Sequence, residues 1–306
     1  VHRRFLHYLE HHAGLDRSIE ALPDDEELDQ RAEAGRGLTS PELAVLLAYA
    51  KNTLAAQLLG TDLADPPWFD GLLRDAFPRP LVDRYGDRLA NHPLRREIIV
   101  TVLVNDLVNR GGATFAFRAQ EETGAGPAEI ARAYVAVRHV FAVPAWWDEI
   151  ETLPFTVPTD AQVALFGESR RLVDRTARWF LQTRRSRLDV ATESTRFAGP
   201  VAAFTPRLKD LIQEEEQDRV RRVAAGFAEL GAPQLQAEEA AVRVDAFSLL
   251  DIVEVSEAAG CSVEKAAEVY FALSERLHVD MLLTRISALD RSDRWNALAR
   301  SALRFD

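Results

Sequence analysis

Apolar side chains recur every three to four residues along most of this chain, which is the spacing of one face of an α-helix. Pro, Gly, Asp and Asn residues separate one such stretch from the next, as expected for helix ends and loops. The pattern predicts helices over residues 3–12, 24–34, 40–59, 67–76, 80–90, 93–110, 114–123, 127–141, 145–153, 160–184, 188–197, 199–211, 214–230, 233–242, 246–259, 262–277, 279–289 and 293–303. We therefore predict an all-α, multi-helix fold of two packed helical subdomains, without a Rossmann sheet.

One stretch, residues 98–104, is β-branched at six of its seven positions and by composition alone would suit a buried strand. Its flanks favour a helix, because Pro93 precedes it and the glycine pair Gly111 and Gly112 follows it. No second strand is evident for it to pair with, and an isolated strand is not stable. We predict a buried helix here.

The helix over residues 40–59 has a well-specified beginning. Thr39 or Ser40 can cap its free N–H groups, Pro41 suits the first helical position, and Glu42 favours the positive end of the helix dipole.

Two prolines in the sequence Leu-Pro-Phe-Thr-Val-Pro, residues 153–158, prevent a helix from continuing through this segment. We predict that it joins a helical subdomain at 35–153 to a second one at 159–306, which starts with a long helix. Residues 183–189 are a second candidate joint.

Composition and charge narrow the classes of partner. The apolar fraction of 47% and the charged fraction of 28% are those of an ordinary soluble protein. A formal net charge of −11 argues against a nucleic acid or an anionic membrane as partner. The single cysteine, Cys261, fits a reducing compartment, and no membrane-span or signal-peptide pattern is present. We expect a cytoplasmic protein.

Two sequence features could hold a metal ion. His7 and His11 stand four residues apart on a predicted helix, beside His12, but no further ligand of suitable spacing follows, which favours a solvated helix. The acidic run at 24–27 could be half of the paired motifs with which helical terpenoid synthases hold magnesium and diphosphate. The second acidic cluster is not evident, and an acidic first helical turn explains the same residues.

Polar residues continue the apolar stripes of the helix at 93–110. Asn105 and Asn109 project on one stripe, and Asp106 and Arg110 on the other. If these groups are buried they need partners. Two accounts stay open: contact with a neighbouring domain or subunit, or hydrogen bonds to loop backbone within the chain.

Three other side chains are candidates for such contacts. Trp146 and Trp147 project from different faces of one helix, so one ring is expected in the core and the other at an interface. Lys51 is expected to form a surface or interdomain salt bridge.

Several longer motifs carry a family resemblance. They include Leu-Thr-Ser-Pro-Glu-Leu at 38–43 and Asn-Asp-Leu-Val-Asn-Arg-Gly-Gly at 105–112, and they lie within residues 38–51, 91–99, 104–118, 131–134, 174–181, 250–255 and 269–273. Together these motifs resemble the C-terminal region of the large, multidomain NAD-dependent glutamate dehydrogenases of bacteria, over nearly the whole chain.

The resemblance implies a mostly helical, non-catalytic portion of an enzyme that converts L-glutamate, NAD and water to 2-oxoglutarate, ammonium and NADH. It implies an upstream catalytic domain in the same polypeptide, reached through a helical connector at residues 1–34, and a homo-oligomer. The start at Val1 rather than methionine also suggests a piece of something longer.

The resemblance implies no catalytic, cofactor-binding or metal-binding residue in this segment, with NAD bound elsewhere in the parent enzyme. The nearest approach to a dinucleotide fingerprint, residues 124–129, lacks a preceding strand and a third glycine, and Pro127 stands where a phosphate-facing N–H is needed. We interpret it as a loop and a helix start. The main alternative to a dehydrogenase segment is a stand-alone helical scaffold or adaptor protein.

Overall fold

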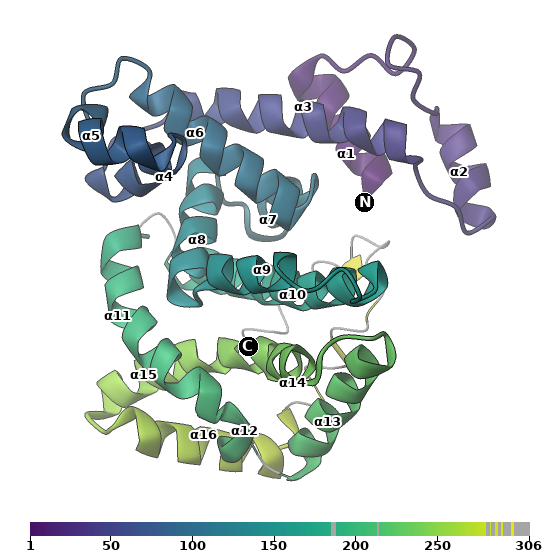
Figure 1. Ribbon diagram of the computed structural model, residues 1–306. Coiled ribbons are helices and arrows are strands. Elements are labelled where there is room, and N and C mark those ends of the chain that lie inside the picture. The colour runs from purple at the N-terminus through teal and green to yellow at the C-terminus, as the bar shows by residue number, and fades with distance from the viewer. Residues whose placement is uncertain are drawn as a thin grey trace. The chain divides into compact units, whose positions relative to one another are not determined.

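The computed structural model describes residues 1–184, 188–212 and 214–279, together with Leu282, Arg285, Ile286, Leu289, Trp295 and Asn296. Every regular element in this part of the chain is a helix, as Figure 1 shows, which confirms the predicted all-α fold without a Rossmann sheet. The chain divides into two compact units, Val1–Arg132 and Ala133–Asp306. None of the described helices combines the length and apolar character needed to cross a membrane.

Unit 1 contains seven complete α-helices and two short helical turns. They are α1 (His2–Ala13), α2 (Asp25–Glu33), α3 (Ser40–Leu59), η1 (Pro67–Phe69), α4 (Asp70–Asp75), α5 (Arg79–Leu89), α6 (Arg95–Asp106), the π turn η2 (Leu107–Gly111) and α7 (Phe115–Thr123). The next helix, α8 (Pro127–Val140), begins in unit 1 and continues in unit 2.

Helices α3 and α6 form the centre of unit 1 and pack against each other. Of the two predicted caps, Thr39 or Ser40, the structure uses Thr39, which forms a capping box with Glu42. The β-branched stretch at 98–104 is helical and buries Ile99, Val100, Leu103 and Val104, which confirms the predicted buried helix. Flanking prolines and glycines outweigh local strand propensity here.

The N-terminal residues belong to this core. Phe5, Leu6 and Leu9 of α1 are buried, and the Phe5 ring lies 5.3 Å from the ring of Phe117 in α7. The role of residues 1–34 as a connector stays a prediction, but α1 is an integral part of unit 1.

Unit 2 contains the remaining elements. After α8 they are α9 (Val143–Glu151), α10 (Thr159–Thr183), α11 (Val190–Phe204), η3 (Thr205–Arg207), α12 (Leu208–Leu211), α13 (Glu214–Glu229), α14 (Gln234–Arg243), η4 (Val244–Phe247), α15 (Ser248–Ala259) and α16 (Val263–Arg276). The predicted helices at 279–289 and 293–303 lie largely outside the described residues.

The long helix α10 supplies much of the core of unit 2, and an aromatic cluster marks its C-terminal end. The rings of Trp179 and Phe180 meet that of Phe197, from α11, at 5.7 and 6.0 Å in edge-to-face geometry. Such pairs add specific attraction to the burial of large apolar surfaces.

One predicted helix boundary is wrong. The sequence predicted separate helices at 188–197 and 199–211, but α11 runs unbroken through Gly199 and Pro200. Proline removes only one backbone donor, and Phe197 and Val201, on either side of the pair, are both buried. Packing of this face keeps the helix continuous, although a Gly-Pro pair usually ends a helix.

The two prolines at 154–158 do interrupt the helices, since α9 ends at Glu151 and α10 begins at Thr159. Phe155 in this loop is fully exposed, whereas Val157 is buried. The subdomain boundaries at 35–153 and 159–306 stay a prediction. The boundary between the two compact units of the structure lies between Arg132 and Ala133, within α8.

Candidate functional site

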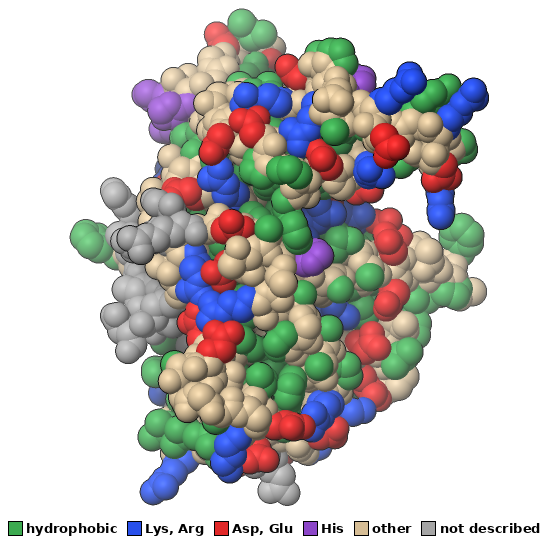
Figure 2. Space-filling view, turned by 90° about the vertical axis from the view of Figure 1, so that its left-hand side faces the viewer, with side chains coloured by type: hydrophobic (Ala, Val, Ile, Leu, Met, Phe, Trp, Pro, Cys, Tyr) green, Lys and Arg blue, Asp and Glu red, His purple; other side chains and the backbone are tan. Residues whose placement is uncertain are grey.

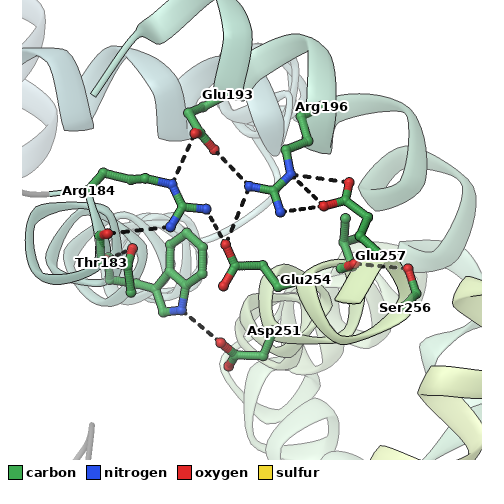
Figure 3. Close-up of polar contacts among 10 residues, drawn as sticks. Thr183, Arg184, Glu193, Arg196, Asp251, Glu254, Ser256 and Glu257 are labelled. Carbon is green, nitrogen blue, oxygen red and sulfur yellow. Dashed lines mark hydrogen bonds and ion pairs between the residues drawn. The ribbon is translucent and has the colours of Figure 1, made fainter. Parts of the chain in front are cut away.

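Two segments of the sequence resemblance, 174–181 and 250–255, meet in unit 2. The Trp179 indole N–H donates a 2.8 Å hydrogen bond to Oδ1 of Asp251, which joins α10 to α15. Burial raises the pKa of Asp251, and the Trp179 bond acts in the opposite direction. This contact forms one edge of a larger polar site, which Figure 3 shows.

Beside it lies a cluster of five charged residues, Arg184, Glu193, Arg196, Glu254 and Glu257, which we call the arginine–glutamate cluster. Arg184 Nε contacts Glu193 Oε1 at 3.0 Å, and a second nitrogen of Arg184 bonds Glu254. Arg196 contacts Glu193 and Glu254 at 3.5 and 3.4 Å and also bonds Glu257 (Figure 3). The cluster therefore ties the end of α10 to α11 and α15.

The electrostatics of this cluster favour its charged form. Burial acts to lower the pKa of Arg184, but hydrogen bonds to Glu254 and Glu193 outweigh it and raise this pKa above its ordinary value. The Arg196 hydrogen bond lowers the pKa of Glu257. Both guanidinium groups also lie over aromatic rings, Arg184 over Trp179 at 5.1 Å and Arg196 over Phe197 at 4.7 Å. These contacts fit a structural clamp between helices.

A second ionic group connects α13 to η4. Arg219 contacts Oδ2 of Asp245 at 2.5 Å and also pairs with Glu216 of its own helix. Burial raises the pKa of Asp245 to about 7; Glu216 acts in the same direction and Arg219 opposes it. Burial likewise raises the pKa of Glu168 in α10. This region is a second polar junction within unit 2.

The residues that the sequence suggested as contact sites fall in both units. Asn105 and Asn109 are exposed at the end of α6 and in η2, while Asp106 and Arg110 are partly exposed. Lys51 is half-buried in α3, and its predicted salt bridge is not found among the described residues. The two asparagines are thus accessible to a neighbour.

Both tryptophans of α9 are buried within unit 2. The Trp147 indole N–H donates a 2.8 Å hydrogen bond to Oγ of Ser169, and the Arg243 guanidinium lies 4.2 Å from the centre of the Trp146 ring. Neither indole offers an exposed face for an interface.

The candidate metal ligands have ordinary structural contacts. His7 pairs with Asp25 at 3.0 Å, and Nδ1 of His11 is 2.8 Å from the His7 carbonyl oxygen. Asp24 caps α2 by accepting a bond from the Glu27 N–H. No group of three or more His, Cys, Asp and Glu side chains in the described residues is arranged to hold a metal ion.

The polar groups of the glycine-rich segment at 124–129 bond within the segment and to the preceding helix. Gly124 ends α7 with a φ of 72°, and the Gly126 N–H donates a 2.7 Å bond to Glu129. These contacts match the predicted loop and helix start.

The arginine–glutamate cluster was missed by sequence reasoning. Its members lie in three separate segments, and the only local signal was the three-residue spacing of Glu193 with Arg196.

The surface of the molecule carries charges of both signs. On the face that Figure 2 shows, Asp and Glu side chains lie among Lys and Arg side chains.

Comparison with known proteins gives a consistent match. A family model described as "Glutamate dehydrogenase, C-terminal" matches residues 35–306. Over the full chain, the sequence is 40% identical to an NAD-specific glutamate dehydrogenase of Mycobacterium tuberculosis, 38% to one of Pseudomonas aeruginosa and 34% to one of Halomonas elongata. The chain spans 19% of the length of each of these relatives.

Proposed function

Because this chain belongs to the glutamate dehydrogenase C-terminal family, which confirms the resemblance seen in its motifs, we propose that it is a structural and assembly region of a large NAD-dependent glutamate dehydrogenase. The parent reaction is oxidation of L-glutamate by NAD and water to 2-oxoglutarate, ammonium and NADH. The segment itself is non-catalytic and holds neither NAD nor a metal. The parent is cytoplasmic and homo-oligomeric.

The main support for the proposal is that the whole chain matches only part of each relative. All of this chain aligns with each relative, yet it accounts for 19% of the relative's length, so most of each relative lies outside the matched region. Dinucleotide-dependent enzymes bind the pyrophosphate where a strand turns into a helix. All regular elements in the described residues are helices, which supports placing NAD in another part of the parent.

The internal contacts support a rigid packing role. In unit 2 the arginine–glutamate cluster joins three helices, and a core of large buried aromatic residues lies beside it. In unit 1 the exposed Asn105 and Asn109 offer amide groups to a neighbouring domain or subunit.

The test compares residues 1–306 with the complete gene product. We expect the segment to fold, with the circular dichroism of a helical protein, and to reduce no NAD with glutamate beyond a heat-killed control, whereas the complete protein does. Turnover by the purified segment would contradict the non-catalytic role. A native protein of only about 34.2 kDa by intact mass would favour the stand-alone adaptor instead.

A further inference from the structure

Unit 2 contains an open cleft of about 1290 Å³ between two groups of helices. Helices α13 and α14 pack side by side and form most of its walls, and η3 and α12 contribute one end. The cleft is separate from the arginine–glutamate cluster, since none of that cluster's five residues lines it.

The floor of the cleft is apolar. Val220, Ala224 and Ala228 follow one another at four-residue spacing along α13, so they share one face of that helix. Leu235 and Val242, seven residues apart on α14, also line the cleft. Leu235 is 61% exposed although it is a large aliphatic side chain. Ala224 is buried, so the uncovered part of this apolar lining is the Leu235 end of the cleft.

Charged groups around the floor are mostly acidic. Five carboxylates line the cleft, Glu149, Asp210, Glu229, Glu238 and Glu239, against three cations, Lys209, Arg221 and Arg243.

Two of these cations are already engaged. Arg221 pairs with Asp218, and Arg243 lies over the Trp146 ring. Burial and the neighbouring Glu149 raise the pKa of Glu239, and the nearby Arg243 acts in the opposite direction.

The size of the cleft favours a polypeptide over a small molecule. Small-ligand sites are typically about 300–1,000 Å³, and this cleft is larger and open. A helix about 10–12 Å across would fill the same volume with roughly two to three turns. An apolar floor between polar rims is the usual form of a groove that receives an amphipathic helix.

Two exposed apolar side chains lie in the loops before α10 and between α13 and α14. Gly231, in the turn between α13 and α14, approaches Pro158 so closely that an added Cβ would lie 2.8 Å from the proline Cδ. The loop that holds the fully exposed Phe155 therefore runs beside this turn, where Leu230 is 44% exposed.

From these observations we propose that the cleft docks a basic amphipathic helix that belongs to the same gene product but lies outside residues 1–306. Its apolar side chains cover the α13–α14 floor, and its Lys and Arg side chains face the acidic rim. The proposal rests on the proposed function, since it requires a longer parent polypeptide.

Charge and symmetry disfavour a second copy of this chain as the occupant. The chain carries a formal charge of −11, so a second copy is on average a poor electrostatic match for the acidic rim of this cleft. A groove that receives a helix is also not self-complementary, as a two-fold interface between copies has to be. The 81% of each relative that lies beyond the matched region supplies ample chain for the helix.

Site-specific photocrosslinking in the complete gene product tests the proposal. A benzophenone amino acid replaces Leu235 in the cleft or, as a matched control, Val269, which is 47% exposed on α16 and does not line the cleft. We expect the Leu235 position alone to crosslink to one peptide from outside 1–306 that has more Lys and Arg than Asp and Glu. Crosslinks to residues 1–306, to another protein or to an acidic peptide would overturn the proposal, as would a yield no higher than that of the control.

Charge reversal gives a second, independent measurement. The double variant Glu229→Lys and Glu238→Lys should lower the crosslink yield at Leu235 by about tenfold, because like charges then face each other across the groove. The control Glu268→Lys makes the same kind of change on the exposed face of α16, and it should leave the yield unchanged. Equal yields in the double variant and the control would refute the acidic-rim contact.

The two proposals can fail separately. Glutamate-dependent NAD reduction by the complete protein reports on the parent function, and the crosslinked peptide reports on the cleft. Active enzyme without the expected crosslink would contradict the docking proposal alone.

Discussion

At the scale of single residues, the most consequential group is the Asp245 carboxyl, which the fold largely shields from water beside Arg219. Its pKa of about 7 lies above the ordinary value of 3.8. Between these two pH values the folded protein binds a proton that the unfolded chain releases. The resulting stabilisation is fully present below about pH 4 and is lost as the pH rises through 7.

We therefore predict that unit 2 is more stable at pH 5 than at pH 8, and that Asp245→Asn removes much of this difference. Each pKa unit is equivalent to about 1.4 kcal/mol, so the effect is of the order of 2–4 kcal/mol. Urea unfolding followed by tryptophan fluorescence at the two pH values measures it.

Glu257→Gln is the matched control for this prediction. The Arg196 bond lowers the pKa of Glu257 below its ordinary value of 4.5, so its contribution is present above that pH and lost as the pH falls. The control should therefore keep the pH 5 to 8 difference. If Asp245→Asn keeps it equally, the assignment to Asp245 is wrong.

At the scale of elements, the turn between α13 and α14 is the most tightly constrained connection. Gly231 has a φ of 94°, and a side chain there meets Pro158 at 2.8 Å. Gly231→Ala should destabilise unit 2 by about 1–3 kcal/mol through backbone strain and overpacking. A fall in the thermal midpoint measures this effect.

Gly226→Ala is the corresponding control, since Gly226 lies within α13 and an added Cβ there meets nothing within 4 Å. Alanine has the higher helix propensity, so this variant should gain about 0.5–1 kcal/mol. Equal midpoints for the two variants would show that the Pro158 contact does not constrain the turn.

Much of the element structure could be predicted from sequence, because apolar periodicity and end signals act locally. The helix at 40–59, with its predicted start at Thr39 or Ser40, is an example. The continuity of α11 through Pro200 could not be predicted, because packing of Phe197 and Val201 decides it. The arginine–glutamate cluster could not be predicted either, because tertiary packing brings together residues far apart in the chain, such as Arg184 and Glu254, which are 70 positions apart.

At the scale of the whole molecule, the limits of the family match and the limits of the folded unit differ. The family model begins at residue 35, whereas α1 contributes the fully buried Leu6 and Leu9 to unit 1. Removing one buried leucine side chain typically costs about 2–5 kcal/mol. Loss of both leucines from a polypeptide of residues 35–306 is thus comparable with the net stability of a typical domain, about 5–15 kcal/mol.

We predict that residues 35–306 aggregate on gel filtration or melt at a clearly lower temperature than residues 1–306. Because a long deletion also changes solubility, Leu9→Ala in the full segment provides a milder test and should lower stability by about 2–5 kcal/mol. His11→Ala, at an exposed position of the same helix, should have little effect. If 35–306 melts like 1–306, then α1 is a dispensable connector, and the contacts of Phe5 with Phe117 do not contribute to the stability of unit 1.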